Sequence, residues 1–99
     1  MKRGEKMEAR ANHILVATEQ QCKDLKARIE KGEITFAKAA RKFSKCPSGS
    51  SGGDLGTFGR GQMVPEFDEV VFSAEVGKVH GPVKTDFGYH LIQIVERSE

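Results

Sequence analysis

The segment from Lys45 to His90 constrains this chain most, because it places large apolar side chains within glycine-rich sequence. Six of the eleven glycines fall within residues 46–61, and Leu55, Met63 and Phe87 stand beside or close to glycines. Glycine is typical of turns and of close backbone approach rather than of helix or strand interiors. We therefore expect Met63 and Phe87 to lie on loops of one domain rather than in the regular elements of its core.

Length, charge and hydropathy indicate a small folded chain. It has 99 residues, of which 37% are hydrophobic and 30% charged, and its formal net charge is +2. This is enough sequence for a modest core without a disulfide or a metal. No apolar run approaches the roughly 18 residues of a membrane span, and the basic start Met1–Lys6 is not followed by the apolar stretch of a signal peptide. We therefore expect a cytoplasmic location and no membrane association.

The first half of the chain reads as one strand followed by two helices. Ala11–Val16 alternates in the manner of a strand. Thr18 and Gln21 form the signature of a capping box, which predicts a first helix that ends at Gly32. Thr35 is then expected to cap a second, shorter helix.

The second predicted helix is amphipathic and basic on its polar side. Its apolar side consists of Phe36, Ala40 and Phe43. The opposite side is predicted to carry four cations, Lys38, Arg41, Lys42 and Lys45. Such a stripe is compatible with nucleic-acid binding, but the low net charge and the lack of interleaved aromatic residues do not favour it. No nucleic-acid partner is therefore expected.

The second half of the chain predicts three strands and one helix. A short strand is expected over residues 54–58, and Pro65 suits the first turn of a third helix. A strand over residues 79–85 and a last strand over residues 89–95 follow. The last strand is apolar on both faces, so we expect it at the centre of the sheet.

The order of elements, βααβαββ, indicates the α+β class. It predicts a four-stranded, largely antiparallel sheet surrounded by helices. One folded domain is expected over residues 11–97, and the polar residues 1–10 are expected to form a flexible N-terminal segment before it.

The two cysteines occur in different contexts. Cys22 shares one side of the first predicted helix with Leu25 and Ile29, which indicates a small core residue, whereas Cys46 lies in a Ser/Gly/Pro loop. A cytosolic chain would keep both reduced. Two cysteines without a C-x-x-C pair give no support for a metal site, so none is predicted.

Four motifs occur in a fixed order along the chain. They are His13-Ile14-Leu15-Val16, Gly52-Gly53-Asp54-Leu55-Gly56, Gly61-Gln62-Met63-Val64-Pro65-Glu66-Phe67 and Thr85-Asp86-Phe87-Gly88-Tyr89-His90. With them the chain resembles the parvulin-type peptidyl-prolyl cis/trans isomerases over roughly Ala11 to Glu96. The resemblance implies the parvulin or FKBP-like fold, which has the same element order.

The resemblance also implies a site for the prolyl ring of a substrate. By their places in the motifs, four apolar residues are expected to line it: Leu55, Met63, Phe67 and Phe87. Each of them taken alone is more typical of a hydrophobic core, and only the motif context favours the pocket.

Four further residues are implied as a catalytic hydrogen-bond network: His13, Cys46, Thr85 and His90. In the family the two histidines lie close together on adjacent strands under the active site, where they either support it structurally or take part in the reaction. The position of Cys46 holds Asp in other members, so an obligate covalent nucleophile is not expected there. No cofactor is expected, because rotation about a bond needs none.

One departure from phosphate-directed members of the family bears on specificity. Their first strand and first helix are joined by a longer, basic loop, whereas Ala17–Gln21 here contains neither Lys nor Arg. The basic stripe of the second helix is expected to point away from the sheet and not to substitute. A phosphate before the proline should therefore give no advantage.

The function predicted from the sequence is peptidyl-prolyl cis/trans isomerisation of proline-containing polypeptides by a monomer that assists protein folding. The reaction is expected to be non-covalent and to need no phosphate. The alternative is a chaperone-like module that binds extended segments with little turnover. The full set of motif residues favours the enzyme over the binding module.

Overall fold

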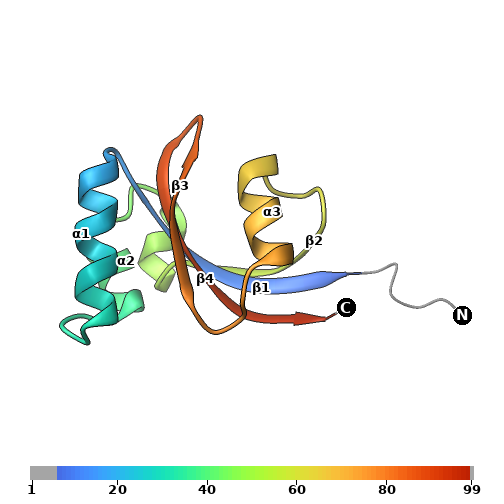
Figure 1. Cartoon of the computed structure of the whole chain (residues 1–99), viewed down its shortest axis with the longest axis horizontal. Helices are drawn as coiled ribbons and strands as arrows, with labels where there is room; N and C mark the ends of the chain where they lie inside the picture. The colour runs from blue at the N-terminus through green and yellow to red at the C-terminus, as the bar shows by residue number, and fades with distance from the viewer. Residues whose placement is uncertain (1–6, 99) are drawn as a thin grey trace, which may run out of the picture.

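A four-stranded antiparallel sheet lies between helices in the computed structural model, which describes residues 7–98 (Figure 1). The elements are β1 (Glu8–Val16), α1 (Glu19–Glu30), α2 (Phe36–Phe43), the 3₁₀ helix η1 (Pro47–Ser51), β2 (Asp54–Gly59), α3 (Pro65–Ser73), β3 (Val79–Thr85) and β4 (Gly88–Ser98). The strand order is β2-β1-β4-β3 and every neighbouring pair is antiparallel. The predicted class and element order are confirmed, and β4 is a central strand as expected.

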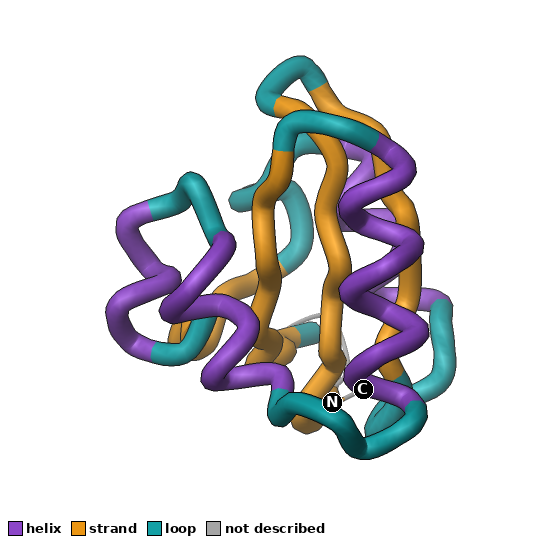
Figure 2. The backbone as a smooth tube through the Cα atoms, turned by 90° about the vertical axis from the view of Figure 1, so that its left-hand side faces the viewer, coloured by secondary structure: helices purple, strands orange, loops and turns teal. Residues whose placement is uncertain are grey.

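One face of the sheet is closed by α1 and α2 (Figures 1 and 2). Thr18 accepts a hydrogen bond from the Gln21 amide at 3.2 Å, and Thr35 accepts one from the Lys38 amide at 3.1 Å, so both predicted caps start their helices. The buried side chains on this face are Ile14, Val16, Cys22, Leu25, Ile34, Phe36, Ala39, Ala40 and Leu91.

The opposite face is covered by α3 along only part of its length. Phe67, Val71 and Phe72 of α3 pack with buried side chains of the central strands, including Ile92 and Ile94. Arg97 of β4 holds the end of this helix, because its guanidinium donates to the carbonyl oxygens of Val71 and Ala74, each at 2.8 Å.

A loop completes the edge of β1 where β2 no longer pairs with it. β2 pairs with β1 only between Glu8 and Asn12. Beyond that point the His13 amide donates to the Gly53 carbonyl at 2.9 Å, and the Lys45 amide donates to the Leu15 carbonyl at 2.7 Å. Gly53 has a φ of +87°, and an added Cβ would lie 2.4 Å from the His13 carbonyl oxygen, so only glycine fits this close approach. The glycine-rich segment is thus part of the sheet's edge.

Two strands are longer than the sequence pattern indicated. β1 begins at Glu8 rather than residue 11, and β4 continues to Ser98 rather than ending at residue 95. In the added part of the two strands, exposed Arg10 lies opposite Glu96 in the strand register, and Ala9 is buried beneath α3. The expected N-terminal segment 1–10 lies largely outside the described residues, and the domain bounds stay predictions. Among the described helices, none has the length and apolar character needed to cross a membrane.

Candidate active site

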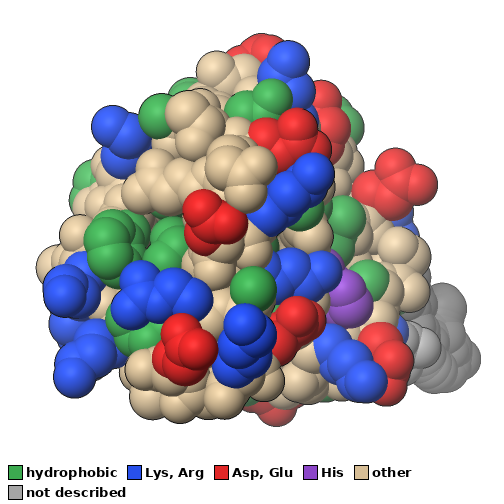
Figure 3. Space-filling model, turned by 60° about the vertical axis from the view of Figure 1, so that its left-hand side comes forward, with side chains coloured by type: hydrophobic (Ala, Val, Ile, Leu, Met, Phe, Trp, Pro, Cys, Tyr) green, Lys and Arg blue, Asp and Glu red, His purple; other side chains and the backbone are tan. Residues whose placement is uncertain are grey.

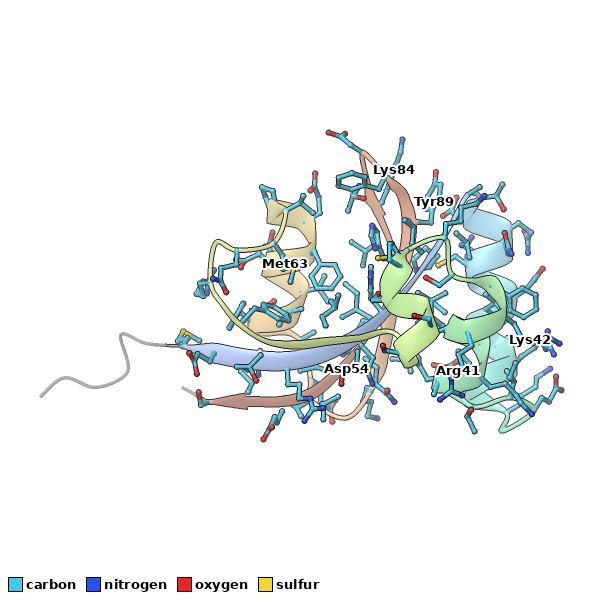
Figure 4. The ribbon with its side chains drawn as sticks, turned by 180° about the vertical axis from the view of Figure 1, so that it is seen from behind. Arg41, Lys42, Asp54, Met63, Lys84 and Tyr89 are labelled. Atoms are coloured by element: carbon cyan, nitrogen blue, oxygen red, sulfur yellow. The ribbon has the colours of Figure 1, made fainter. Side chains whose placement is uncertain are left out.

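A pocket of about 460 Å³ opens where α3 leaves the sheet uncovered. Its floor is formed by β1 and β4, one wall by α3 and the loop before it, and the other wall by the loop that follows α2. The lining residues are His13, Leu15, Lys45, Cys46, Pro47, Leu55, Met63, Val64, Phe67, Phe87 and His90. Figure 4 shows Met63 on the α3 side of the molecule, with Arg41 and Lys42 on α2 pointing away from it.

All four residues predicted for the prolyl-ring site line this pocket, although they come from separate parts of the chain. Leu55 lies on β2, Met63 precedes α3, Phe67 lies within α3, and Phe87 lies in the turn between β3 and β4. Their exposure differs widely, since Phe67 is 3% exposed and Phe87 is 68% exposed. Phe67 is therefore shared with the core, whereas Phe87 forms the outer rim.

The two predicted histidines meet on the floor of the pocket. His13 on β1 and His90 on β4 are both buried, and their Nδ1 atoms are 3.1 Å apart. The rings are stacked with centroids 5.3 Å apart, and the Phe67 ring meets both edge-on at 5.5 and 5.8 Å. Strand alternation explains the meeting, because neighbouring antiparallel strands bring the two side chains to the same face of the sheet.

A chain of hydrogen bonds extends from this pair in both directions. Thr85 Oγ1 lies 2.7 Å from His90 Nε2, and Ser48 Oγ lies 3.1 Å from His13 Nε2. Ser48 Oγ also lies 3.3 Å from Cys46 Sγ, with which it forms a hydrogen bond. Among the hydrogen bonds of residues 7–98, Cys46 is thus linked to the histidines through Ser48 and not directly. Sequence reasoning missed Ser48; the signal for it was its place two residues after Cys46, where Pro47 opens the η1 turn.

Burial keeps both histidines uncharged at neutral pH. It lowers the pKa of His13 to about 4, with a further lowering from the charge that His90 would carry, and it also lowers the pKa of His90. Each neutral imidazole has one N–H, and the contact between the two Nδ1 atoms requires one donor and one acceptor. The proton on one ring therefore fixes the proton on the other, so the histidines, Thr85 and Ser48 form one coupled network.

The two thiols have different surroundings. Both cysteines are free; Cys22 is 1% exposed, and burial raises the pKa of its thiol to about 11. Cys46 is half-buried in the pocket wall. Within residues 7–98 no group of three or more His, Cys, Asp or Glu side chains is placed to hold a metal ion.

The predicted position of Lys45 on the polar side of the second helix is wrong. α2 ends at Phe43, and Ser44 is extended with φ −69° and ψ 136°, so the helical spacing no longer applies beyond it. The chain instead turns along β1, and Lys45 lines the pocket. The pocket wall therefore carries a cation that the sequence pattern placed elsewhere.

Comparisons with known proteins agree with this geometry. The rotamase family described as "PPIC-type PPIASE domain" matches residues 5–96. The "Foldase protein PrsA" of Geobacillus kaustophilus is 48% identical over 95 residues, which cover 95% of this chain and 34% of the relative. The chain thus spans about a third of the length of such curated relatives.

Solved structures of similar proteins share the fold. A crystal structure of the peptidylprolyl isomerase PrsA from Bacillus anthracis is 35% identical with a TM-score of 0.90, covering 95% of this chain and 43% of that one. The structure of Pin from the archaeon Cenarcheaum symbiosum is 36% identical with a TM-score of 0.79 and covers 97% of both chains. The chain therefore belongs to the PPIC-type, or parvulin, family of peptidyl-prolyl cis/trans isomerases.

Proposed function

We propose that the pocket receives the prolyl ring of an unphosphorylated polypeptide and that the domain catalyses rotation about the X-Pro bond without a covalent intermediate. The observation that carries the proposal is a largely apolar pocket of about 460 Å³ whose floor is a pair of uncharged histidines. An apolar pocket of this kind holds a ring that has no hydrogen-bond donor.

The physical basis is the change in the amide as it twists. The planar amide is stabilised by conjugation, and the barrier to rotation is about 18–20 kcal/mol. The twisted amide has lost that conjugation and is less dipolar, so an apolar environment disfavours it less than it disfavours the planar form. Lowering the barrier by about 5 kcal/mol would accelerate rotation several thousandfold. The pocket needs to favour only the twisted state to do so.

The surroundings of Cys46 support a non-covalent reaction. A nucleophilic thiol is normally activated by a base within about 2.6–3.2 Å. Here Ser48 lies between Cys46 and His13, and its hydroxyl bonds to both. The histidines are therefore better suited to hold the floor and the wall in place than to take the thiol proton.

The lack of a basic loop supports the absence of a phosphate requirement. The connection between β1 and α1 is Ala17-Thr18, and the helix then begins with Glu19. We also propose that the domain is monomeric and cytoplasmic. A role within a longer foldase is likewise a proposal, because the chain spans about a third of the foldases that it resembles.

The test is a protease-free isomerisation assay on X-Pro peptides with two matched variants. Met63→Ala should lower kcat/KM at least about tenfold, a loss of about 1.4 kcal/mol in transition-state binding. Val70→Ala removes a half-buried side chain from α3 that packs against the same core as Met63 but does not line the pocket, and it should leave kcat/KM unchanged. Folded protein that binds the peptides without accelerating rotation would instead indicate the chaperone-like module.

A second variant tests the role of the thiol. Cys46→Asp should keep substantial activity, because a carboxylate can accept the Ser48 hydrogen bond in place of the sulfur. Complete loss of activity in folded Cys46→Asp protein, measured in the same assay, would restore a nucleophilic role for Cys46.

A further inference from the structure

Of the described residues that line the pocket, Lys45 alone carries a formal charge at neutral pH. The two lining histidines are neutral, because burial lowers the pKa of both, and the other lining side chains are apolar or thiol. Apolar walls screen a charge less than bulk water does, so one ammonium group dominates the field at the mouth of the pocket.

The backbone of Lys45 is held firmly while its side chain is exposed. Its amide donates to the Leu15 carbonyl at 2.7 Å, and Ser44 Oγ accepts from the amides of Leu15 at 3.1 Å and Cys46 at 3.3 Å. These bonds fix the segment to the edge of β1. The ammonium group can therefore move only within the reach of its own stem, beside the site of the prolyl ring.

Lys45 has no acidic partner within residues 7–98. The ion pairs among the described residues join other cations to carboxylates, such as Arg10 to Asp54 and Arg60 to Asp68. The charge of Lys45 is thus available to a bound molecule rather than neutralised within the fold.

The cations of α2 do not share this position. Figure 4 shows Arg41 and Lys42 pointing away from the side of Met63. In Figure 3 the basic side chains on the α1 and α2 side of the molecule are interspersed with acidic ones, so no single-sign surface is formed on that face. Lys45 therefore lies apart from Arg41 and Lys42, the cations that Figure 4 shows on α2.

We infer that Lys45 is a specificity-determining residue that favours an acidic side chain next to the proline of the substrate. The inference rests on the proposed function, because it assumes that the prolyl ring occupies the pocket. A carboxylate on the residue before or after the proline would pair with the ammonium group at the pocket mouth. An exposed pair of this kind is screened by solvent, so the preference should be about threefold and should weaken as salt is added.

The experiment compares glutamate with its neutral isostere glutamine. The kcat/KM of the wild-type chain is measured on peptides that carry Glu or Gln before the proline, and on a second pair that carries them after it. We expect a Glu/Gln ratio of about three in at least one pair at low salt. Lys45→Met, which keeps much of the apolar stem, should bring that ratio to about one, and Lys45→Glu should reverse the preference.

Lys38→Met is the matched control, since it removes the same charge from an exposed position on α2. It should keep the wild-type ratio. A ratio of one in both peptide pairs for the wild type, or an unchanged ratio in Lys45→Met, would overturn the inference while leaving the proposed function intact. Absence of catalysis on the Gln peptides by folded wild-type protein would instead overturn the proposed function, and the inference with it.

Discussion

Helices cover the two faces of the sheet to different extents. On the face covered by α1 and α2, Ile14, Leu25 and Leu91 are at most 3% exposed and the buried side chains are all apolar. On the other face α3 closes only one end, and at the other end His13 and His90 form the floor of an open pocket. The same sheet thus has a closed face and an open face.

The two faces are built from adjacent residues of the same strands. His13 and Ile14 are neighbours on β1, and His90 and Leu91 are neighbours on β4. Because side chains alternate along a strand, one residue of each pair stabilises the closed face and the other faces the pocket. The comparison teaches that the core beneath α1 and α2 and the proposed substrate pocket are separated by side of the sheet rather than by segment of the chain.

Acid should produce the largest effect, and it should act through the open face. Burial lowers the pKa of His13 to about 4 from 6.5, so between these values the unfolded chain binds more protons than the folded one. Stability contributed by the neutral histidine is present above pH 6.5 and is lost as the pH falls towards about 4. The loss should be on the order of 3 kcal/mol from His13 alone, and His90 adds to it.

Urea unfolding over that pH window measures this effect. Replacement of His13 by Gln should flatten the dependence of unfolding free energy on pH. Asp54→Asn is the control, because the hydrogen bond from Arg10 lowers the pKa of Asp54 and places its titration below the window. A direct NMR titration that finds both imidazoles protonated at pH 6 would contradict the prediction. On the closed face, burial raises the pKa of the Cys22 thiol to about 11, so this thiol does not titrate in that window.

A cavity in the core of the closed face should lower the unfolding free energy without changing kcat/KM. Leu25 of α1 is 3% exposed and packs in the core between α1 and the sheet. Leu25→Ala should lower the unfolding free energy by about 3 kcal/mol. Under conditions where the variant is fully folded, kcat/KM should equal that of the wild type, and a tenfold drop would show that the two faces are coupled.

Truncation of a side chain at the rim of the open face should lower kcat/KM and leave the unfolding free energy nearly unchanged. Phe87 is 68% exposed, and its amide donates to Thr85 Oγ1 at 3.1 Å, a backbone bond that alanine keeps. Phe87→Ala should leave the unfolding free energy within about 0.5 kcal/mol of the wild type and lower kcat/KM about tenfold. Val76→Ala, at another exposed apolar position, should change neither quantity.

Much of the fold could be predicted from the sequence because its signals are local. Thr18 and Thr35 marked the helix starts, and the apolar character of β4 on both faces indicated a central strand. The early start of β1 could not be predicted, because Ala9 is small and flanked by exposed Glu8 and Arg10, and it is recognisable as buried only when α3 lies above it.

The pocket was harder to predict than the fold. Phe67 and Phe87 are the same residue type in equally strong motifs, yet tertiary cover makes one a core residue and the other a rim residue. Ser48 contacts His13 across 35 positions of sequence, a pairing that depends on the η1 turn. The helical spacing gave the wrong position for Lys45, because α2 ends at Phe43 and the spacing does not apply beyond it.

A phosphate on the residue before the proline should change kcat/KM least of all. The size of this change depends on how many cations lie near the pocket. A phosphate carries about −1.5 to −2 charges at neutral pH, and several Arg or Lys donors are needed to replace its water. Of the described residues that line the pocket, one is a cation, Lys45, on an exposed side chain, and the β1–α1 connection supplies none. Phosphoserine should therefore raise kcat/KM over serine by no more than the roughly threefold expected for glutamate over glutamine. Paired peptides that differ only by the phosphate measure this ratio at low and high salt. A preference of tenfold or more that survives in Lys45→Met would mean that the open face holds a second cationic site, and the distinction between a neutral pocket and a single charged rim residue would then be wrong.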